Sequence, residues 1–175
     1  MALTPTERED FSKYARSPET WVLAARRSAA VAKLLRRRAD ELVHATERDF
    51  FEFSGCHYAS YFHTAMAVEN ALKAALICRD PSIVENGALN TKKFGGKSGH
   101  ALVNAALTVF GALTEAERRV LTKLEEYVWA GRYTVPTKAD VLYDAERMHN
   151  LRTSTPEDVM IVESLIDRAV KSAGK

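Results

Sequence analysis

Cysteine and long apolar runs are both scarce in this 175-residue chain, and each absence excludes a class of protein. The two cysteines, Cys56 and Cys78, fall in a stretch that we interpret as one continuous helix. Its rise would hold them about 33 Å apart, too far for a disulfide, so we predict a reduced, cytoplasmic protein. No apolar run approaches the roughly 18 residues of a membrane span, and segment 1–10 is too polar for a secretory signal.

The sequence also lacks a large excess of positive or negative charge, and it lacks metal-binding motifs. The formal net charge is only +2, which does not by itself indicate a polyanionic partner. The five histidines lack the spacing of metal ligands, and neither an HExxH motif nor paired CxxC motifs occur, so we predict no metal and no cofactor. The hydrophobic fraction of 46% and charged fraction of 27% are typical of a folded globular chain. We expect one domain over 1–175, with 1–17 as an N-terminal appendage.

Helix signals are what the sequence does contain. Thr4, Ser17 and Thr155 are each followed by proline, which is the pattern of an N-cap residue before the first helical position. Thr114 and Glu117 form a capping box. Behind these signals, apolar residues recur every three or four positions. The expected helices are 18–46, 56–79, 100–113, 114–129, 138–149 and 155–172, with a shorter one near 4–17.

The segments between these helices carry glycine and proline. Gly55 is expected to break the helical pattern, the glycine-rich stretch 86–99 is expected to be a loop, and 134–137 is expected to be extended. No strand-like alternation competes with the helical periodicity. We therefore predict an all-α antiparallel bundle of five to six helices on short connections.

Three motifs carry a resemblance to a known family. Residues 61–76 begin with the aromatic pair Tyr61-Phe62 and place Glu69 four residues before Lys73 in an Ala/Leu-rich stretch. Gly99-His100-Ala101-Leu102 leads into the next helix, and an Arg-Tyr pair with a later proline lies in 129–136. In this order, over about 56–150, the motifs resemble those of the HEPN family of helical bundles.

The resemblance implies a four- or five-helix bundle, usually a homodimer, with a polar cleft that holds a nucleotide or RNA. Many members of the family are endoribonucleases of toxin–antitoxin or defence systems. Others are non-catalytic and bind nucleotides or partner proteins. The expected partners are therefore a nucleotide or RNA, a second copy of the chain and a protein from a neighbouring gene, with no membrane.

Glu69, Lys73 and Lys97 are candidate ligand-binding residues. Glu69 and Lys73 have the spacing of a surface ion pair, worth about 0.2–0.5 kcal/mol, and the resemblance equally suggests that Lys73 contacts a phosphate. Lys97 belongs to the basic, glycine-rich segment 92–99, whose backbone N–H groups could bind an anion. The segment is not a P-loop, because Thr91 stands where that motif needs glycine. A surface loop is the preferred interpretation.

His100, Arg132 and Tyr133 have both structural and functional interpretations. His100 precedes a helix N-terminus, where anions bind favourably, so it could contact a phosphate or act as a general acid; a packing or capping histidine is the alternative. Arg132 could stabilise the carbonyl end of a helix or bind a phosphate, and Tyr133 beside it could stack on a base.

The nuclease pattern of the family is only partly present. Its RNase members carry an arginine and, after four to six residues, a histidine, whereas Arg147 and His149 here are separated by one residue. On a helix their side chains would diverge by about 200°. The six cations within 26–38 are interpreted as a solvated face in preference to a phosphate-binding one.

Three hypotheses follow. The first is a HEPN-like domain that binds a nucleotide or RNA in a cleft formed by Lys73, His100, Arg132 and Tyr133. The second is a divergent metal-independent endoribonuclease, with His100 or His149 as the acid or base and Arg132 or Arg147 as the phosphate cation. The third is a non-catalytic interaction module for a nucleotidyltransferase-like partner.

Overall fold

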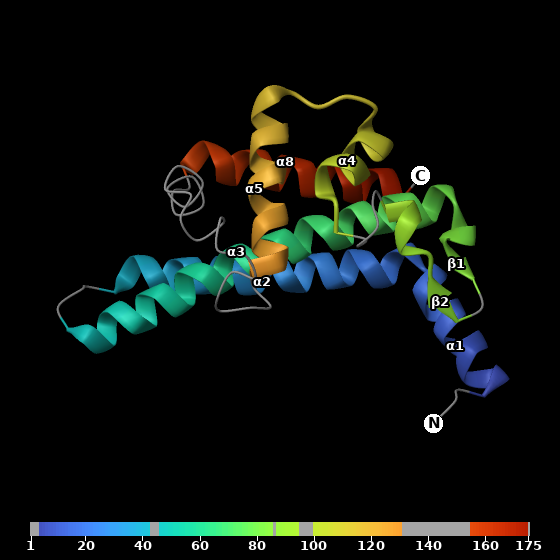
Figure 1. Ribbon diagram of the computed structural model, residues 1–175, viewed down its shortest axis with the longest axis horizontal. Helices are drawn as coiled ribbons and strands as arrows, with labels where there is room; N and C mark the ends of the chain where they lie inside the picture. Colours follow the sequence, from blue (N-terminus) through green and yellow to red (C-terminus); the bar gives the residue numbers. More distant parts are fainter. Residues whose placement is uncertain (1–3, 43–45, 86, 95–99, 131–154, 175) are drawn as a thin grey trace, which may run out of the picture.

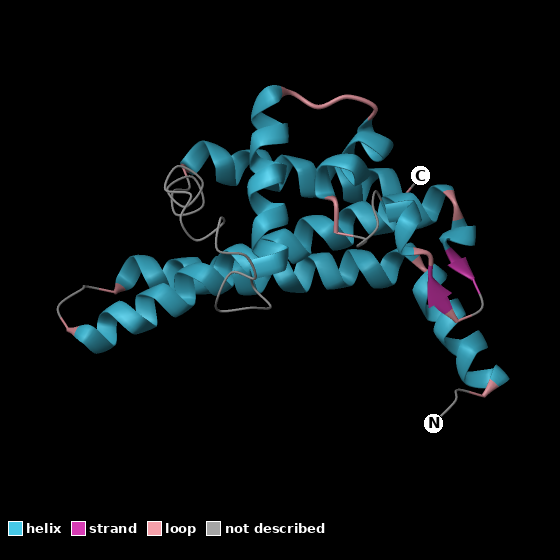
Figure 2. Ribbon diagram, viewed as in Figure 1, coloured by secondary structure: helices cyan, strands magenta, loops and turns pink. Residues whose placement is uncertain are grey.

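The chain is an all-α helical bundle, as predicted (Figure 1). The computed structural model describes residues 4–42, 46–85, 87–94, 100–130 and 155–174, and the expected helix 138–149 lies outside these ranges. The α-helices are α1 Pro5–Arg16, α2 Pro18–Glu41, α3 Glu47–Arg79, α4 Leu102–Phe110, α5 Glu115–Ala130 and α8 Pro156–Ala173. Two short strands, β1 Val84–Glu85 and β2 Ala88–Leu89, lie between 3-10 turns at Pro81–Ile83 and Thr91–Phe94 (Figure 2).

Threonine capping boxes begin four of these helices. The side chains of Thr4, Thr46, Thr114 and Thr155 each accept a backbone N–H three residues later, at 3.1–3.2 Å. The predicted starts near 4, 114 and 155 are therefore confirmed. Ser17 is the N-cap residue of α2 by position, but it makes no side-chain cap. Its hydroxyl donates instead to the Glu19 carboxylate at 2.6 Å.

The predicted break at Gly55 is wrong, because α3 runs without interruption from Glu47 to Arg79. The break lies earlier: α2 ends at Glu41 and not near 46, and the Thr46–Asp49 capping box starts the next helix. A glycine inside a helix costs only about 1 kcal/mol relative to alanine, which does not end a helix that is packed along its length. Cys56 and Cys78 both lie in α3 as free thiols.

Helix α4 is shorter than expected at both ends. It covers Leu102–Phe110 and not 100–113, because Gly111 has a φ of +81° and ends it. The Gly111 N–H donates to the Leu107 carbonyl at 2.8 Å, which closes the last turn. Glycine takes this left-handed conformation without the steric penalty of a side chain.

The stretch 86–99, expected to be a loop, contributes part of a hairpin that the sequence did not suggest. Strands β1 and β2 pair antiparallel, with Val84 opposite Leu89, and are too short to show an alternating pattern. The hairpin packs against α1. The Arg16 guanidinium donates to the Val84 carbonyl at 3.0 and 2.8 Å, and the Gly87 N–H donates to the Ser12 hydroxyl at 3.2 Å.

Helix α3 is the centre of the bundle, with α2 along one side and α4, α5 and α8 on the other (Figure 1). Both α2 and α3 bury alanines, whose small side chains allow two helix backbones to approach closely. In α2 the buried side chains are Ala25, Ala32 and Ala39, spaced by seven residues, whereas Val31 is 37% exposed.

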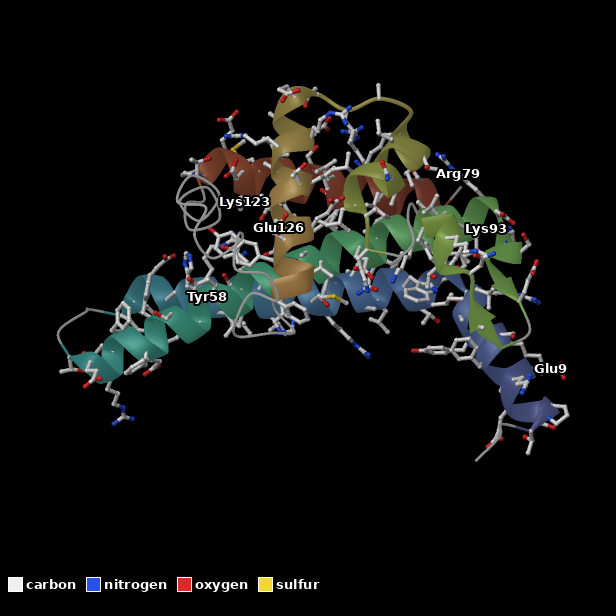
Figure 3. All side chains as sticks on the ribbon, viewed as in Figure 1. Glu9, Tyr58, Arg79, Lys93, Lys123 and Glu126 are labelled. Carbon is white, nitrogen blue, oxygen red and sulfur yellow. The ribbon has the colours of Figure 1, made fainter. Side chains whose placement is uncertain are left out.

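The two ends of α3 differ in environment. From Ser60 onward it is largely buried in the bundle, and Tyr61 stacks there on Tyr127 of α5 with ring centroids 4.5 Å apart. Its N-terminal part projects with the end of α2 beyond α4, α5 and α8 (Figure 1). Phe50 and Phe51, in the first turns of α3, are 53% and 64% exposed. Tyr58, labelled in Figure 3, is 45% exposed, and its ring centroid lies 6.4 Å from that of Tyr127 on α5.

Alanine substitutions at Gly55 and Gly87 are expected to change stability in opposite directions. A Cβ at Gly55 meets nothing within 4 Å, so Gly55→Ala should raise the free energy of unfolding by about 0.5–1 kcal/mol. Gly87 has a φ of +72°, and a Cβ there would lie 2.9 Å from the Arg8 Cβ. Gly87→Ala should therefore cost about 1–2 kcal/mol or more. Urea unfolding of both variants tests this, and destabilisation by Gly55→Ala would contradict a continuous α3.

Candidate functional site

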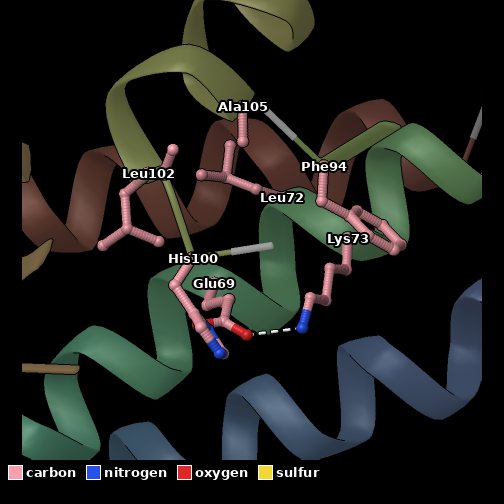
Figure 4. A pocket seen from close by; sticks show the side chains of 8 residues that line it. Glu69, Leu72, Lys73, Phe94, His100, Leu102 and Ala105 are labelled. Atoms are coloured by element: carbon pink, nitrogen blue, oxygen red, sulfur yellow. Dashed lines mark hydrogen bonds and ion pairs between the residues drawn. The ribbon is translucent and has the colours of Figure 1, made fainter. Parts of the chain in front are cut away.

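Three of the predicted site residues, Glu69, Lys73 and His100, meet in one pocket. Glu69 and Lys73 are one turn apart on α3, and His100 lies just before α4. Figure 4 shows them at one edge of the pocket, whose other lining side chains are mainly apolar: Leu72, Phe94, Ala101, Leu102 and Ala105. The other predicted site residues lie outside the described ranges: Lys97, Arg132, Tyr133, Arg147 and His149.

The Glu69 carboxylate binds both of the other residues. One of its oxygens accepts a hydrogen bond from the Lys73 ammonium, and the other lies 2.9 Å from Nδ1 of His100. Only 4% of the Glu69 side chain is exposed, against 13% for Lys73 and 16% for His100. The i, i+4 pair therefore exists, but it is a buried pair and not the solvated surface pair of one sequence interpretation.

Two aromatic rings lie close to the Lys73 ammonium. Its Nζ lies 5.4 Å from the ring centroid of Trp21 on α2 and 5.3 Å from that of Phe94, at the end of the second 3-10 turn. Both distances are within the range of a cation–π interaction. Trp21 is itself fixed, because its indole N–H donates to the Ala15 carbonyl at 2.8 Å. The position of Lys73 is thus set by a carboxylate and two rings from three parts of the chain.

The charges of this trio determine which ligands it can bind. The formal charges of Glu69 and Lys73 compensate each other, so this pair adds no net charge to the site. An ionised Glu69 accepts the Nδ1–H of His100, which selects the neutral tautomer with its lone pair on Nε2. A carboxylate-oriented histidine of this kind can transfer protons, and its imidazolium form can bind an anion.

The carboxylate of Glu125 caps the N-terminus of α4, next to His100, and no sequence motif indicated this residue. The Val103 N–H donates to the Glu125 carboxylate of α5 at 2.8 Å, and the N-cap residue Ala101 has no side chain to perform this role. His100 is therefore not the capping residue. Burial raises the pKa of Glu125, the nearby Glu126 charge raises it further, and the hydrogen bond from Val103 opposes both effects.

Substitution of Glu125 is expected to separate its charge from its capping role. A raised pKa means that Glu125 favours the folded state below its unfolded pKa, and that this contribution is lost as the pH rises through the folded pKa. Glu125→Gln keeps an acceptor for Val103 but cannot ionise. Its stability relative to wild type should increase from about pH 4 to about pH 7, measured by thermal unfolding. Glu125→Ala loses the cap and should cost about 1 kcal/mol. A pH-independent difference for Glu125→Gln would contradict the raised pKa.

Comparison with known proteins gives no relative for this site. None of the protein-family models, curated proteins or solved structures compared with the chain matches it. Within the described ranges, no group of three or more His, Cys, Asp or Glu side chains could hold a metal ion. None of the helices described is long and apolar enough to cross a bilayer.

Proposed function

We propose that this chain is a HEPN-like domain that binds a nucleotide or RNA, with Glu69, Lys73 and His100 lining its polar cleft. The observation that supports this is the convergence of the three residues. The resemblance relates two of the motifs to a ligand cleft, and the side chains of these motifs share one pocket. A carboxylate, an ammonium and an imidazole beside an aromatic ring offer contacts for a phosphate, a ribose hydroxyl and a base.

Binding measurements with a charge-neutral pair of variants test this proposal. Glu69→Gln combined with Lys73→Met removes both charges, keeps similar side-chain volumes and leaves no unpaired buried ion. We expect the double variant to bind fluorescent RNA and nucleotides at least tenfold more weakly than wild type. Glu9→Gln combined with Lys13→Met is the matched control, because that i, i+4 pair on α1 is 68% and 71% exposed. Unchanged binding by a folded Glu69–Lys73 double variant would show that these residues do not form the binding site.

A metal-independent endoribonuclease is the second candidate, favoured by the 2.9 Å contact between His100 and Glu69. Incubation with labelled structured and single-stranded RNA in EDTA should then give cleavage that is lost in His100→Gln, where the amide can still donate to Glu69. His63→Gln, on the same helix as Glu69, is the control. In this hypothesis the phosphate cation is Arg132 or Arg147, with His149 as the alternative acid or base. Intact RNA at high protein concentration would exclude it.

Homodimer formation or binding of a neighbouring protein is supported by a different surface. The projecting N-terminal part of α3 exposes the side chains of Phe50 and Phe51, whose ring centroids lie 6.0 Å apart. Exposed apolar side chains that cluster in this way are typical of interaction surfaces. Light scattering of wild type and of Phe50→Ser combined with Phe51→Ser tests the homodimer. A monomeric wild type that co-purifies with a neighbouring gene product, without affinity for nucleic acid, would favour the interaction module.

A further inference from the structure

A second pocket lies between α2, α3, α5 and α8, and it shares no lining residue with the Glu69 pocket. Its polar lining comes from all four helices: Arg36, Tyr61, Thr64, Lys123 and Asp158. Its apolar lining consists of Val120, Leu124, Val159 and Val162. The space measures about 270 Å³ including its open mouth.

Lys123 lies on α5 (Figure 3). It lines this pocket, where Asp158 is the one acidic side chain among the described lining residues. The Lys123 side chain is 12% exposed, and its Nζ lies 3.8 Å from the nearest Asp158 oxygen, which is longer than a normal hydrogen bond. The Tyr61 ring centroid is 5.4 Å from the same atom. Burial lowers the pKa of Lys123, and the nearby Arg119 charge acts in the same direction, while Asp158 opposes both. An additional anion would stabilise this ammonium.

Asp158 cannot satisfy Lys123 fully, because its carboxylate has other partners. One oxygen accepts a hydrogen bond from Arg119 at 3.0 Å, and the other accepts the Thr155 backbone N–H at 3.3 Å in the capping box of α8. Its negative charge is therefore shared between two cations and the start of a helix. Among the described residues that line the pocket, Arg36 and Lys123 are the cations and Asp158 is the one acid, so the formal charge of this lining is positive.

Arg36 supplies the second cation of the pocket wall. Its neighbours Arg37 and Arg38 pair with the carboxylates of Glu41 and Glu52. Arg36 is half-buried, and within the described part of the chain no carboxylate pairs with it; its guanidinium lies 3.5 Å from the Thr64 hydroxyl. That hydroxyl already donates to the Ser60 carbonyl at 2.7 Å, so it can only accept from Arg36. This contact leaves most of the guanidinium donors for another acceptor.

We propose that this pocket binds a phosphate group, held between the Arg36 guanidinium on α2 and the Lys123 ammonium on α5. A phosphate group brings the negative charge that these two cations attract, and guanidinium and ammonium groups are its usual protein donors. The apolar walls exclude water and strengthen the attraction. Because the pocket is open at its mouth, the phosphate group can be either free or at the end of a larger molecule. This site is independent of the function proposed for Glu69, Lys73 and His100.

Calorimetric titration of the whole protein with inorganic phosphate, at constant ionic strength set by chloride, tests the proposal. We expect saturable binding with a matching rise in Tm. Arg36→Met and Lys123→Met should each weaken the binding at least tenfold, whereas Arg37→Met should not. Lys123→Met should fold, because Arg119 still compensates Asp158 and a buried charge is removed. Circular dichroism of each variant verifies this.

Further arms identify the source of the phosphate and test the independence of the site. Binding of 5′-AMP but not adenosine, with the same dependence on Arg36 and Lys123, would support a phosphate carried by a larger molecule. Binding of inorganic phosphate without 5′-AMP would support a free anion. The Glu69→Gln, Lys73→Met double variant should retain the phosphate response. Absence of saturable binding by either probe, or binding that survives both Arg36→Met and Lys123→Met, would overturn the proposal.

Discussion

Replacing Glu69 with alanine is expected to lower the free energy of unfolding by about 3–5 kcal/mol, because it removes one partner of a buried ion pair. The Lys73 ammonium would remain between the Trp21 and Phe94 rings without its carboxylate. Nδ1 of His100 would lose its acceptor in the same variant. Urea unfolding, followed by circular dichroism, measures the change.

The controls for Glu69 separate the effect of burial from that of charge. Glu9→Ala breaks an exposed pair of the same spacing and should cost no more than about 1 kcal/mol. Replacing both Glu69 and Lys73 with apolar residues, as Glu69→Leu with Lys73→Met, should recover much of the loss, because no buried ion is then unpaired. Equal costs for Glu9→Ala and Glu69→Ala would contradict a buried site.

Phe94→Ala is expected to have a similarly large effect, about 3–5 kcal/mol, because it removes a large side chain from the core. Phe94 is only 2% exposed and belongs to the hydrophobic core, although it comes from a 3-10 turn. Its loss would also remove one of the two rings beside Lys73. Thermal unfolding tests this against Phe51→Ala, whose side chain is 64% exposed and should change stability by less than about 0.5 kcal/mol. Equal shifts in Tm would show that Phe94 does not stabilise the core.

The helices were predictable where a local signal exists. The cap residues Thr4, Thr114 and Thr155 act through contacts three residues away, so the sequence contains the whole interaction. The Thr46–Asp49 box has the same form, and giving it more weight than Gly55 would have placed the start of α3 correctly. Gly111 is the one glycine within the predicted helix 100–113, it has a positive φ, and α4 ends just before it, so giving this glycine more weight would have placed the end correctly.

The candidate site was predictable only in part. The four-residue spacing of Glu69 and Lys73 indicates their contact, but their burial comes from Trp21 and Phe94, which are distant in the sequence. The cations within 26–38 were predicted to form a solvated face, but Arg36 among them is half-buried and lines a pocket. The pocket of Arg36 and Lys123 needs four helices to come together, so no local pattern indicates it.

The seven-residue spacing of Ala25, Ala32 and Ala39 has a consequence for how the chain can change in length. Seven residues make nearly two turns, so a segment of seven added to α2 would return the same face to α3 with a rotation of only about 20°. A matching segment in α3 would extend the projecting end of α2 and α3 without moving the helices around Glu69. The length of this projection is thus separable from the rest of the fold, and it can vary in whole heptads.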